Sequence, residues 1–306
     1  MTPTRQGSIH LFRLAGIDVF LHWSWFLIAA YEIMNRRTDY SSMMWNALEY
    51  GALFLIVLMH EFGHSLACRQ VGGESNQILL WPLGGVAYVN PPQRPGATLW
   101  SIAAGPLVNV ALLPILSGLW WLTRSWGWPM TAPDAYMLVR AVWVINCALL
   151  VFNLMPIYPL DGGQILRSLL WYWLGRARSL FVTSIVGFVG VAVLILVALA
   201  WKSVWLGIMA AFILMNCWTG LRQARLLARA DQHPRHAGFA CPSCHASPPV
   251  GAFWACEKCR IGFDTFETLG ACPQCGEKFP VTRCLDCGAL HAMREWLRPP
   301  PRLPGA

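Results

Sequence analysis

Charged side chains are scarce in this 306-residue chain: Asp, Glu, Lys and Arg together make up 12% of it, whereas hydrophobic residues make up 56%. A soluble domain ordinarily carries about twice that charged fraction, so the composition excludes an ordinary soluble protein. The 17 tryptophans gather near the ends of apolar runs, as at Trp120 and Trp121. Because amphipathic indole rings favour bilayer interfaces, the composition predicts a membrane protein.

A clean secretory leader is also lacking. Arg5 and Arg13 precede the first apolar run, as basic residues precede a signal peptide, but Asp18, His22 and Glu32 interrupt that run. A signal peptide needs an unbroken apolar core of about 7–15 residues. We therefore expect the first apolar run to span the membrane and to stay in the protein.

Apolar runs long enough for a membrane helix occur only in the first 230 residues. Each is close to the ~20 residues that a helix needs to cross the hydrocarbon core. The sequence predicts an all-α polytopic membrane protein with about six transmembrane helices. The candidate spans are approximately 17–34, 46–69, 98–122, 136–156, 180–201 and 204–221.

The most informative residues are His60, Glu61 and His64, which directly follow the apolar stretch Leu53–Met59. Residues four apart lie on one face of a helix, so both imidazoles can bind one zinc ion, with the glutamate between them as general base. Ionisable groups are costly inside a bilayer and usually functional there. The spacing thus predicts metal-dependent hydrolysis at a membrane.

A second constellation, the segment from Asn153 to Gly163 with the sequence NLMPIYPLDGG, lies about 90 residues further on. Together the two motifs resemble those of the site-2 protease family of intramembrane zinc metalloproteases, over roughly residues 9–225. The resemblance implies that His60, His64 and Asp161 hold a catalytic zinc and that Glu61 activates water. It also implies substrates that are transmembrane segments of membrane-tethered proteins, which are often regulators. The pattern departs at Tyr158, where many members carry another proline.

Two asparagines are further candidates. Asn153 begins the second motif, and Asn109 ends the segment 104–109, which resembles a family motif on the intervening helix. An amide that faces the site can bind the substrate backbone or stabilise an oxyanion, but amides also hold membrane helices together. The sequence favours the functional alternative for Asn153 and decides neither for Asn109.

Between the second and third spans, residues 78–89 are apolar but too short and too rich in Gly and Pro for a spanning helix. Two short strands around Gly84 and Gly85 predict a re-entrant β-hairpin. A free strand edge would hold an extended substrate through main-chain hydrogen bonds. The alternative, a loop with only a packing role, is equally compatible with the sequence.

Basic side chains predict the orientation. If the amino terminus is cytoplasmic, ten Lys and Arg residues fall on the cytoplasmic side of the predicted spans and five on the opposite side. This agrees with the positive-inside rule and, with six crossings, places both termini in the cytoplasm. We expect a multi-pass protein of the bacterial cytoplasmic membrane.

After about residue 230 the apolar runs stop and cysteine becomes frequent. We therefore expect a transmembrane metalloprotease domain over 1–230 and a cytoplasmic domain over 231–306 that resembles a double zinc ribbon, with a disordered Pro-rich end. A closed tetrahedral site needs four thiolates, so four Cys-x-x-Cys pairs predict two metal sites of zinc or iron, with their pairing open. Disulfides are disfavoured in a reducing cytoplasm. The cysteines are Cys241, Cys244, Cys256, Cys259, Cys272, Cys275, Cys284 and Cys287.

Charge argues against nucleic acid as the partner of the tail. Residues 231–306 hold eight basic and seven acidic side chains. Eight thiolates with two Zn²⁺ bring the net charge to about −3, the wrong sign for binding phosphate. A regulatory protein is the better candidate partner.

The alternative for the whole chain is a non-catalytic membrane scaffold or a metal-handling protein, which would have no need of Glu61.

Overall fold

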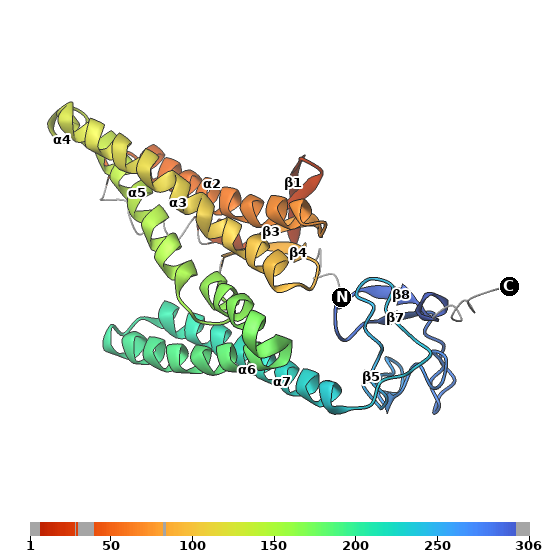
Figure 1. Ribbon diagram of the computed structural model, residues 1–306. Coiled ribbons are helices and arrows are strands. Elements are labelled where there is room, and N and C mark those ends of the chain that lie inside the picture. The colour runs from red at the N-terminus through yellow and green to blue at the C-terminus, as the bar shows by residue number, and fades with distance from the viewer. Residues whose placement is uncertain (1–6, 28, 30–39, 82–83, 298–306) are drawn as a thin grey trace. The chain divides into compact units, whose positions relative to one another are not determined.

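The computed structural model describes residues 7–27, 29, 40–81 and 84–297, and of the five long helices in these residues four are strongly apolar. They are α2 (Met43–Gln70), α3 (Pro95–Ser125), α5 (Pro133–Leu154) and α6 (Asp161–Ala200). Within the described residues these four are long and apolar enough to cross a bilayer. α2 packs against α3, and the short α4 (Trp128–Thr131) joins α3 to α5 (Figure 1). The predicted membrane protein is confirmed, but six crossings are not.

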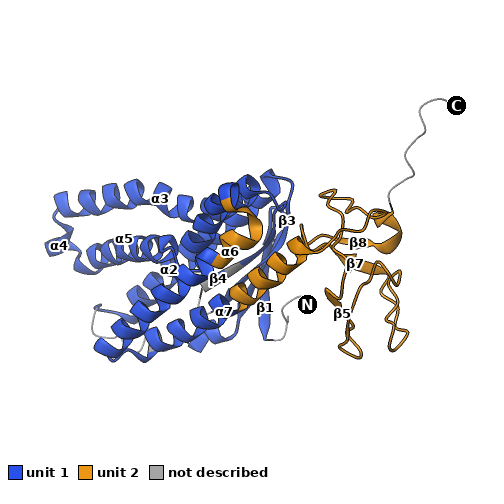
Figure 2. Ribbon diagram, turned by 60° about the horizontal axis from the view of Figure 1, so that its bottom comes forward, with its two compact units in different colours: residues 1–173, 182–218 blue, residues 174–181, 219–306 orange. Residues whose placement is uncertain are grey.

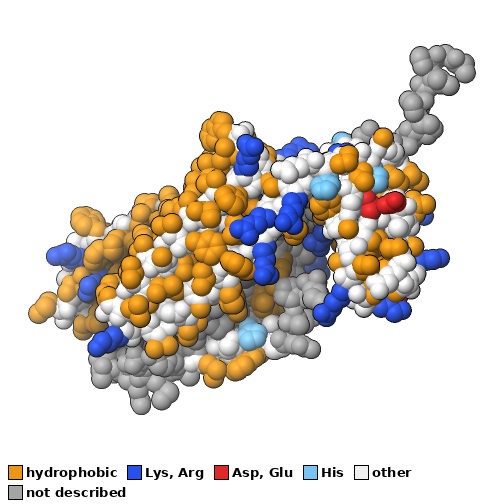
Figure 3. All heavy atoms as spheres, turned by 90° about the horizontal axis from the view of Figure 1, so that it is seen from below, with side chains coloured by type: hydrophobic (Ala, Val, Ile, Leu, Met, Phe, Trp, Pro, Cys, Tyr) orange, Lys and Arg blue, Asp and Glu red, His pale blue; other side chains and the backbone are white. Residues whose placement is uncertain are grey.

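The outer faces of these helices are apolar. Side chains such as Ile115, Val151 and Leu196 are about two-thirds exposed, at 64%, 67% and 66%. Figure 3 shows that hydrophobic side chains cover much of the visible helical surface. Contiguous apolar surface of this extent is expected where a protein faces lipid.

The sixth expected span is covered by α7 (Val204–Gln232), which is helical but is not among the four candidate spans. The first expected span does not begin as a helix. Residues 8–14 and 17–22 form strands β1 (Ser8–Leu14) and β2 (Ile17–His22), so a helix from residue 17 was a wrong prediction. In β2 Ile17, Val19 and Leu21 are buried on one face while the intervening residues are less buried, which is the period of a strand. Of the rest of that span, residues 24–27 are helical, whereas 28 and 30–34 lie outside the described residues.

The predicted hairpin is confirmed and belongs to a larger sheet. Strands β3 (Glu74–Trp81) and β4 (Gly84–Asn90) pair antiparallel, and the strand order is β1-β2-β3-β4. β2 and β3 run parallel because α2 lies between them in the chain. Ile78 and Leu80 of β3 pack with β2 and with Val57 of α2, so the sheet is held against the helix that carries the His-Glu-x-x-His motif. β4 is an edge strand of this sheet.

The helix α6 is interrupted at Gly175, whose φ of 75° and ψ of 173° are not helical. The chain divides into two units there and within α7 (Figure 2). One unit comprises 1–173 and 182–218, and the other comprises 174–181 and 219–306. The Cys-rich tail therefore groups with a short piece of α6 and the end of α7.

The tail contains two small antiparallel pairs and a 3-10 helix. They are β5 (Trp254–Ala255) with β6 (Gly262–Phe263), β7 (Val281–Arg283) with β8 (Leu290–Ala292), and η1 (Met293–Trp296). Phe266 and Trp296 pack with Cys241 and Cys284 in a core that combines aromatic rings and thiols. The predicted Pro-rich end, 298–306, lies outside the described residues.

A buried carboxylate organises the loops of this tail. Asp264 accepts hydrogen bonds from Nε2 of His236 and from the backbone N–H of Gly251. Burial by itself would raise its pKa, but these bonds and those from the N–H of Phe266 and Glu267 lower the pKa below its ordinary value. Asp264 is therefore charged at neutral pH and connects segments that share little regular structure.

Candidate active site

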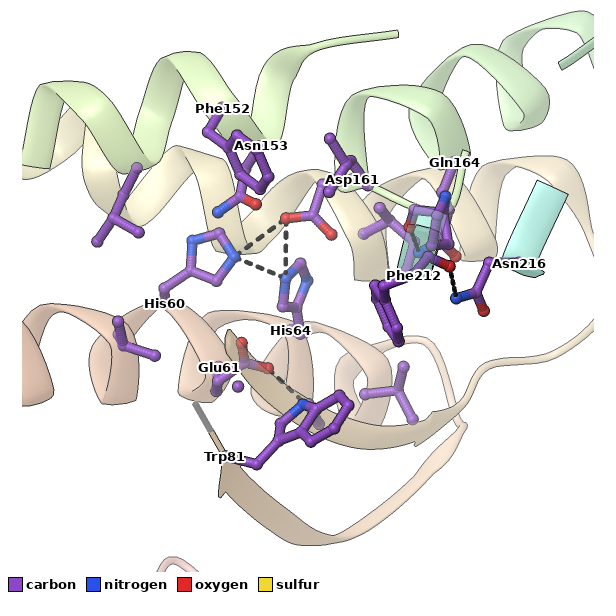
Figure 4. A pocket seen from close by; sticks show the side chains of 18 residues that line it. His60, Glu61, His64, Trp81, Phe152, Asn153, Asp161, Gln164, Phe212 and Asn216 are labelled. Atoms are coloured by element: carbon purple, nitrogen blue, oxygen red, sulfur yellow. Dashed lines mark hydrogen bonds and ion pairs between the residues drawn. The ribbon is translucent and has the colours of Figure 1, made fainter. Parts of the chain in front are cut away.

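The two sequence motifs meet in the first unit. Nε2 of His60 lies 3.1 Å from Nε2 of His64 and 3.0 Å from Oδ2 of Asp161, and Nε2 of His64 lies 3.3 Å from the same oxygen. All three side chains point toward one position (Figure 4). The two histidines come from α2, and Asp161 is the first residue of α6.

These three groups fit a zinc ion. Ligand atoms held at about 2.0–2.1 Å in a tetrahedral arrangement lie roughly 3.3 Å apart, which is close to the observed separations. Two imidazole nitrogens and a carboxylate are a hydrolytic donor set that leaves a fourth position open. Both histidines are nearly fully buried, and with the proton of each on Nδ1 the two Nε2 lone pairs and the Asp161 carboxylate would face one another as acceptors, an arrangement that a cation stabilises.

Helix α3 contacts the Nδ1 atom of both imidazoles, the nitrogen that faces away from the proposed metal. Nδ1 of His64 donates to the backbone carbonyl of Ser101 at 2.9 Å, and Nδ1 of His60 lies 2.7 Å from Oδ1 of Asn109. A proton on Nδ1 leaves the Nε2 lone pair for a metal, which is the usual role of an outer partner. The sequence motif around Asn109 on α3 therefore supports the metal site without contributing a ligand.

Two glycines make room for the catalytic side chains. A Cβ at Gly105 would lie 2.2 Å from Nε2 of His64 and 2.8 Å from Nε2 of His60. A Cβ at Gly85 on β4 would lie 2.3 Å from Cγ of Glu61. Close approach of backbone to side chain explains why glycine occupies both positions.

The turn before α6 places Asp161. A Cβ at Gly162 would lie 2.3 Å from the carbonyl oxygen of Leu154, so the start of α6 packs directly on the end of α5. The positive end of the α6 dipole favours a carboxylate at this first position. The departure at Tyr158 leaves this placement intact.

Glu61 lies on the opposite side of the two histidines from Asp161, next to the hairpin (Figure 4). Its Oε2 accepts a hydrogen bond of 2.9 Å from the backbone N–H of Ala87 on β4. The base therefore contacts the edge strand that the sequence had suggested for substrate. The sequence did not identify Ala87, because the contact joins residues 26 positions apart through a backbone group.

A cavity of about 450 Å³ opens onto these groups. Asn153, expected to contact substrate, lines it together with the metal ligands and Glu61. Sequence reasoning missed Gln164, Trp81 and Asn216, which also line it. Asn109, by contrast, is fully buried behind His60, a geometry that favours an orienting role over contact with substrate.

Known proteins resemble this chain in sequence and in structure. Residues 50–126 and 128–197 match the family described as Peptidase family M50. The structure resembles the site-2 protease from Methanocaldococcus jannaschii with a TM-score of 0.50 and 26% sequence identity, covering 70% of this chain and 95% of that one. This chain belongs to the site-2 protease family. The proposed zinc ligands and Glu61 all lie within the matched residues.

Curated relatives of this site-2 protease family member include a zinc metalloprotease of M. jannaschii. The two are 34% identical over 184 residues, which is 59% of this chain and 50% of the relative. The stage IV sporulation protein FB of Bacillus subtilis is 30% identical over 118 residues, 37% of each. The chain thus spans about half the length of the M. jannaschii relative and 37% of the B. subtilis relative.

The tail of this family member forms two tetracysteine clusters, and the structure assigns the pairing that the sequence left open. The first Cys-x-x-Cys pair joins the fourth, and the second joins the third. Sγ separations across the clusters are 3.5 and 3.7 Å in one and 3.5 and 3.6 Å in the other. Thiolates about 2.3 Å from one metal lie roughly 3.8 Å apart, whereas a disulfide is near 2.05 Å. Both clusters fit a metal.

This pairing makes a prediction about metal content. We expect about three metal ions per chain by elemental analysis. Cys241→Ser and Cys256→Ser should each remove one ion and leave two, because they break different clusters. The double variant should retain one. Loss of both tail metals in either single variant would contradict two separate sites.

Proposed function

We propose that this chain is an intramembrane zinc metalloendopeptidase that cleaves membrane-tethered proteins in or near their transmembrane segments, in regulated proteolysis. The observation that carries the proposal is the convergence of His60, His64 and Asp161 beside Glu61 in a buried cavity. A binding protein needs no general base, so Glu61 favours the enzyme over a membrane scaffold or a metal-handling protein.

When bound, zinc would polarise the scissile carbonyl and acidify a water molecule. The chain's own residues supply the remaining steps. Glu61 accepts the proton of the attacking water at a carboxylate oxygen and passes it to the leaving amine. Asn153, on the cavity wall near His60 in Figure 4, is placed to hold the substrate backbone or the oxyanion.

The substrate strand binds along β4. This strand forms an edge of the sheet, and its residue Ala87 already directs its N–H toward Glu61. An extended peptide paired with β4 would bring its scissile bond to the base, as in β-augmentation. Cavity side chains such as Trp81 and Phe212, whose rings are 5.7 Å apart, would contact the substrate's apolar residues.

The active site opens toward the cytoplasmic side. The proposed catalytic residues lie near the end of α2 and the start of α6, close in sequence to Arg69 and Arg167. Basic residues near the ends of spans favour the cytoplasmic face. The tail then lies in the cytoplasm, where its reduced cysteines hold structural zinc. Iron is the competing metal for these sites. The tail contacts a regulatory protein.

The direct test uses the full-length chain purified in detergent with a panel of single-span membrane substrates. We expect site-specific cleavage that a zinc chelator abolishes and added Zn²⁺ restores. A His64→Ala variant, which lacks one proposed ligand, should show neither activity nor restoration. Cleavage that persists in that variant would reject the assigned site. A complete absence of cleavage across the panel would favour the non-catalytic alternative.

A further inference from the structure

A chain of buried amides leads away from His60 to a residue that no motif identifies. Oδ1 of Asn109 on α3 faces Nδ1 of His60 at 2.7 Å, and Nδ2 of Asn109 donates to Oδ1 of Asn146 on α5 at 2.9 Å. Nδ2 of Asn146 in turn donates to the backbone carbonyl oxygen of Asn109 at 3.0 Å. Both asparagines are fully buried, with 0% of their surface exposed.

The first link determines which nitrogen of His60 is free. Nε2 of His60 faces His64 and Asp161, so it must keep its lone pair if it is to bind a metal. The imidazole proton then resides on Nδ1 and needs an acceptor. Oδ1 of Asn109 provides one. If the Asn109 amide were reversed, its N–H₂ group would face Nδ1 and favour the tautomer with the proton on Nε2, which leaves Nε2 no lone pair for zinc.

An amide by itself can present either end, so something must fix the direction of Asn109. Asn146 does so, because its own direction is unambiguous. The carbonyl of residue 109 can only accept a hydrogen bond, so Asn146 must turn its N–H₂ group toward that carbonyl. Its Oδ1 then faces Nδ2 of Asn109, and Oδ1 of Asn109 faces His60.

We propose that Asn146 is a positioning residue for the catalytic metal: it fixes the amide of Asn109 and thereby the metal-binding tautomer of His60. The inference rests on the zinc site proposed above. The hydrogen bonds run from the backbone carbonyl of Asn109 through the fully buried side chains of Asn146 and Asn109 to His60, a proposed zinc ligand. Polar amides that only hold helices together would require no particular direction at Asn109.

The test measures zinc affinity by chelator competition on the full-length protein. The catalytic ion is identified as the one lost in His64→Ala. Asn146→Leu removes both hydrogen bonds of this side chain while roughly keeping its volume. We expect it to bind the catalytic zinc about 10–100-fold more weakly, which is the usual cost of losing an outer partner. The two tail metals should stay bound, which shows that the protein is folded.

Trp143→Phe is the matched control. Trp143 lies on α5 three residues before Asn146, and its Nε1 donates to Oγ of Ser117 on α3 at 2.9 Å. This variant removes a hydrogen bond between the same two helices without touching the His60 chain. We expect its catalytic zinc affinity to equal that of the wild type. Equal affinity in Asn146→Leu and Trp143→Phe would overturn the inference.

A double-mutant cycle separates positioning from simple packing. If Asn146 acts only through Asn109, the double variant Asn109→Leu/Asn146→Leu should bind zinc no more weakly than Asn109→Leu alone. Independent, additive losses would overturn the proposal. If Asn146→Leu does not fold, Asn146→Ser, which is too short to bridge both groups, takes its place with the same expectation. Unchanged metal content in His64→Ala would instead refute the zinc site itself, and this inference with it.

Discussion

Replacing Glu61 by glutamine is expected to abolish cleavage while leaving the catalytic zinc in place. The amide has nearly the same shape and can still contact the N–H of Ala87 through its oxygen, but it cannot take a proton from water. General-base catalysis contributes roughly 10²–10⁴-fold to a rate, so the cleavage rate should fall by at least about 100-fold. Initial cleavage rates and elemental analysis of the same preparation measure the two quantities.

Glu49→Gln provides the control for this substitution. Glu49 is a second buried glutamate of α2 and accepts a hydrogen bond from the hydroxyl of Tyr40 at 2.5 Å. It lies outside the catalytic cavity, so its replacement should leave the rate within a few-fold of wild type while imposing a comparable change on the helix. Undiminished turnover in Glu61→Gln would remove the protease mechanism proposed here.

Asp161→Ala is expected to lose both the catalytic metal and activity, retaining about two ions per chain in the tail. The variant leaves only the two imidazoles as ligands and removes the one carboxylate ligand. Zinc affinity should therefore fall by more than the roughly 10–100-fold that loss of an outer partner costs. Chelator competition and cleavage assays on one preparation measure both effects.

Asp134→Ala is the corresponding control, because Asp134 is likewise an acidic residue in the first turn of a long apolar helix. It accepts a hydrogen bond from the backbone N–H of Ser41 and lies away from the cavity. Its replacement should leave three metals bound. Normal zinc occupancy in Asp161→Ala would show that another group supplies the third ligand.

The chemistry of the site could be predicted from sequence because it depends on local geometry. His60 and His64 share a helix face by their spacing alone, and Glu61 lies between them wherever that helix is placed. Each Cys-x-x-Cys pair likewise forms half of a metal site within one short turn. The hairpin at 78–89 was also predictable, because its two apolar strands are adjacent in the chain, although Gly84 and Gly85 belong to β4.

Where polar residues interrupt an apolar run, the sequence was ambiguous. Residues 17–22 are apolar enough for a span, yet Asp18 and His22 alternate with buried side chains and the segment pairs with both β1 and β3. One of these two partners, β3, begins more than 50 residues later. Hydropathy averaged over a window cannot detect such a partner.

The sequence by itself determined the two candidate histidine ligands, the glutamate between them and the four Cys-x-x-Cys pairs, because local spacing alone places those groups together. Tertiary structure alone decided how the cysteine pairs combine, which backbone group contacts Glu61, and that Asn146 lies behind Asn109 and His60. These contacts join segments from different helices and strands. Their geometry depends on how close the backbones approach at residues such as Gly105, and only the packed fold sets that distance.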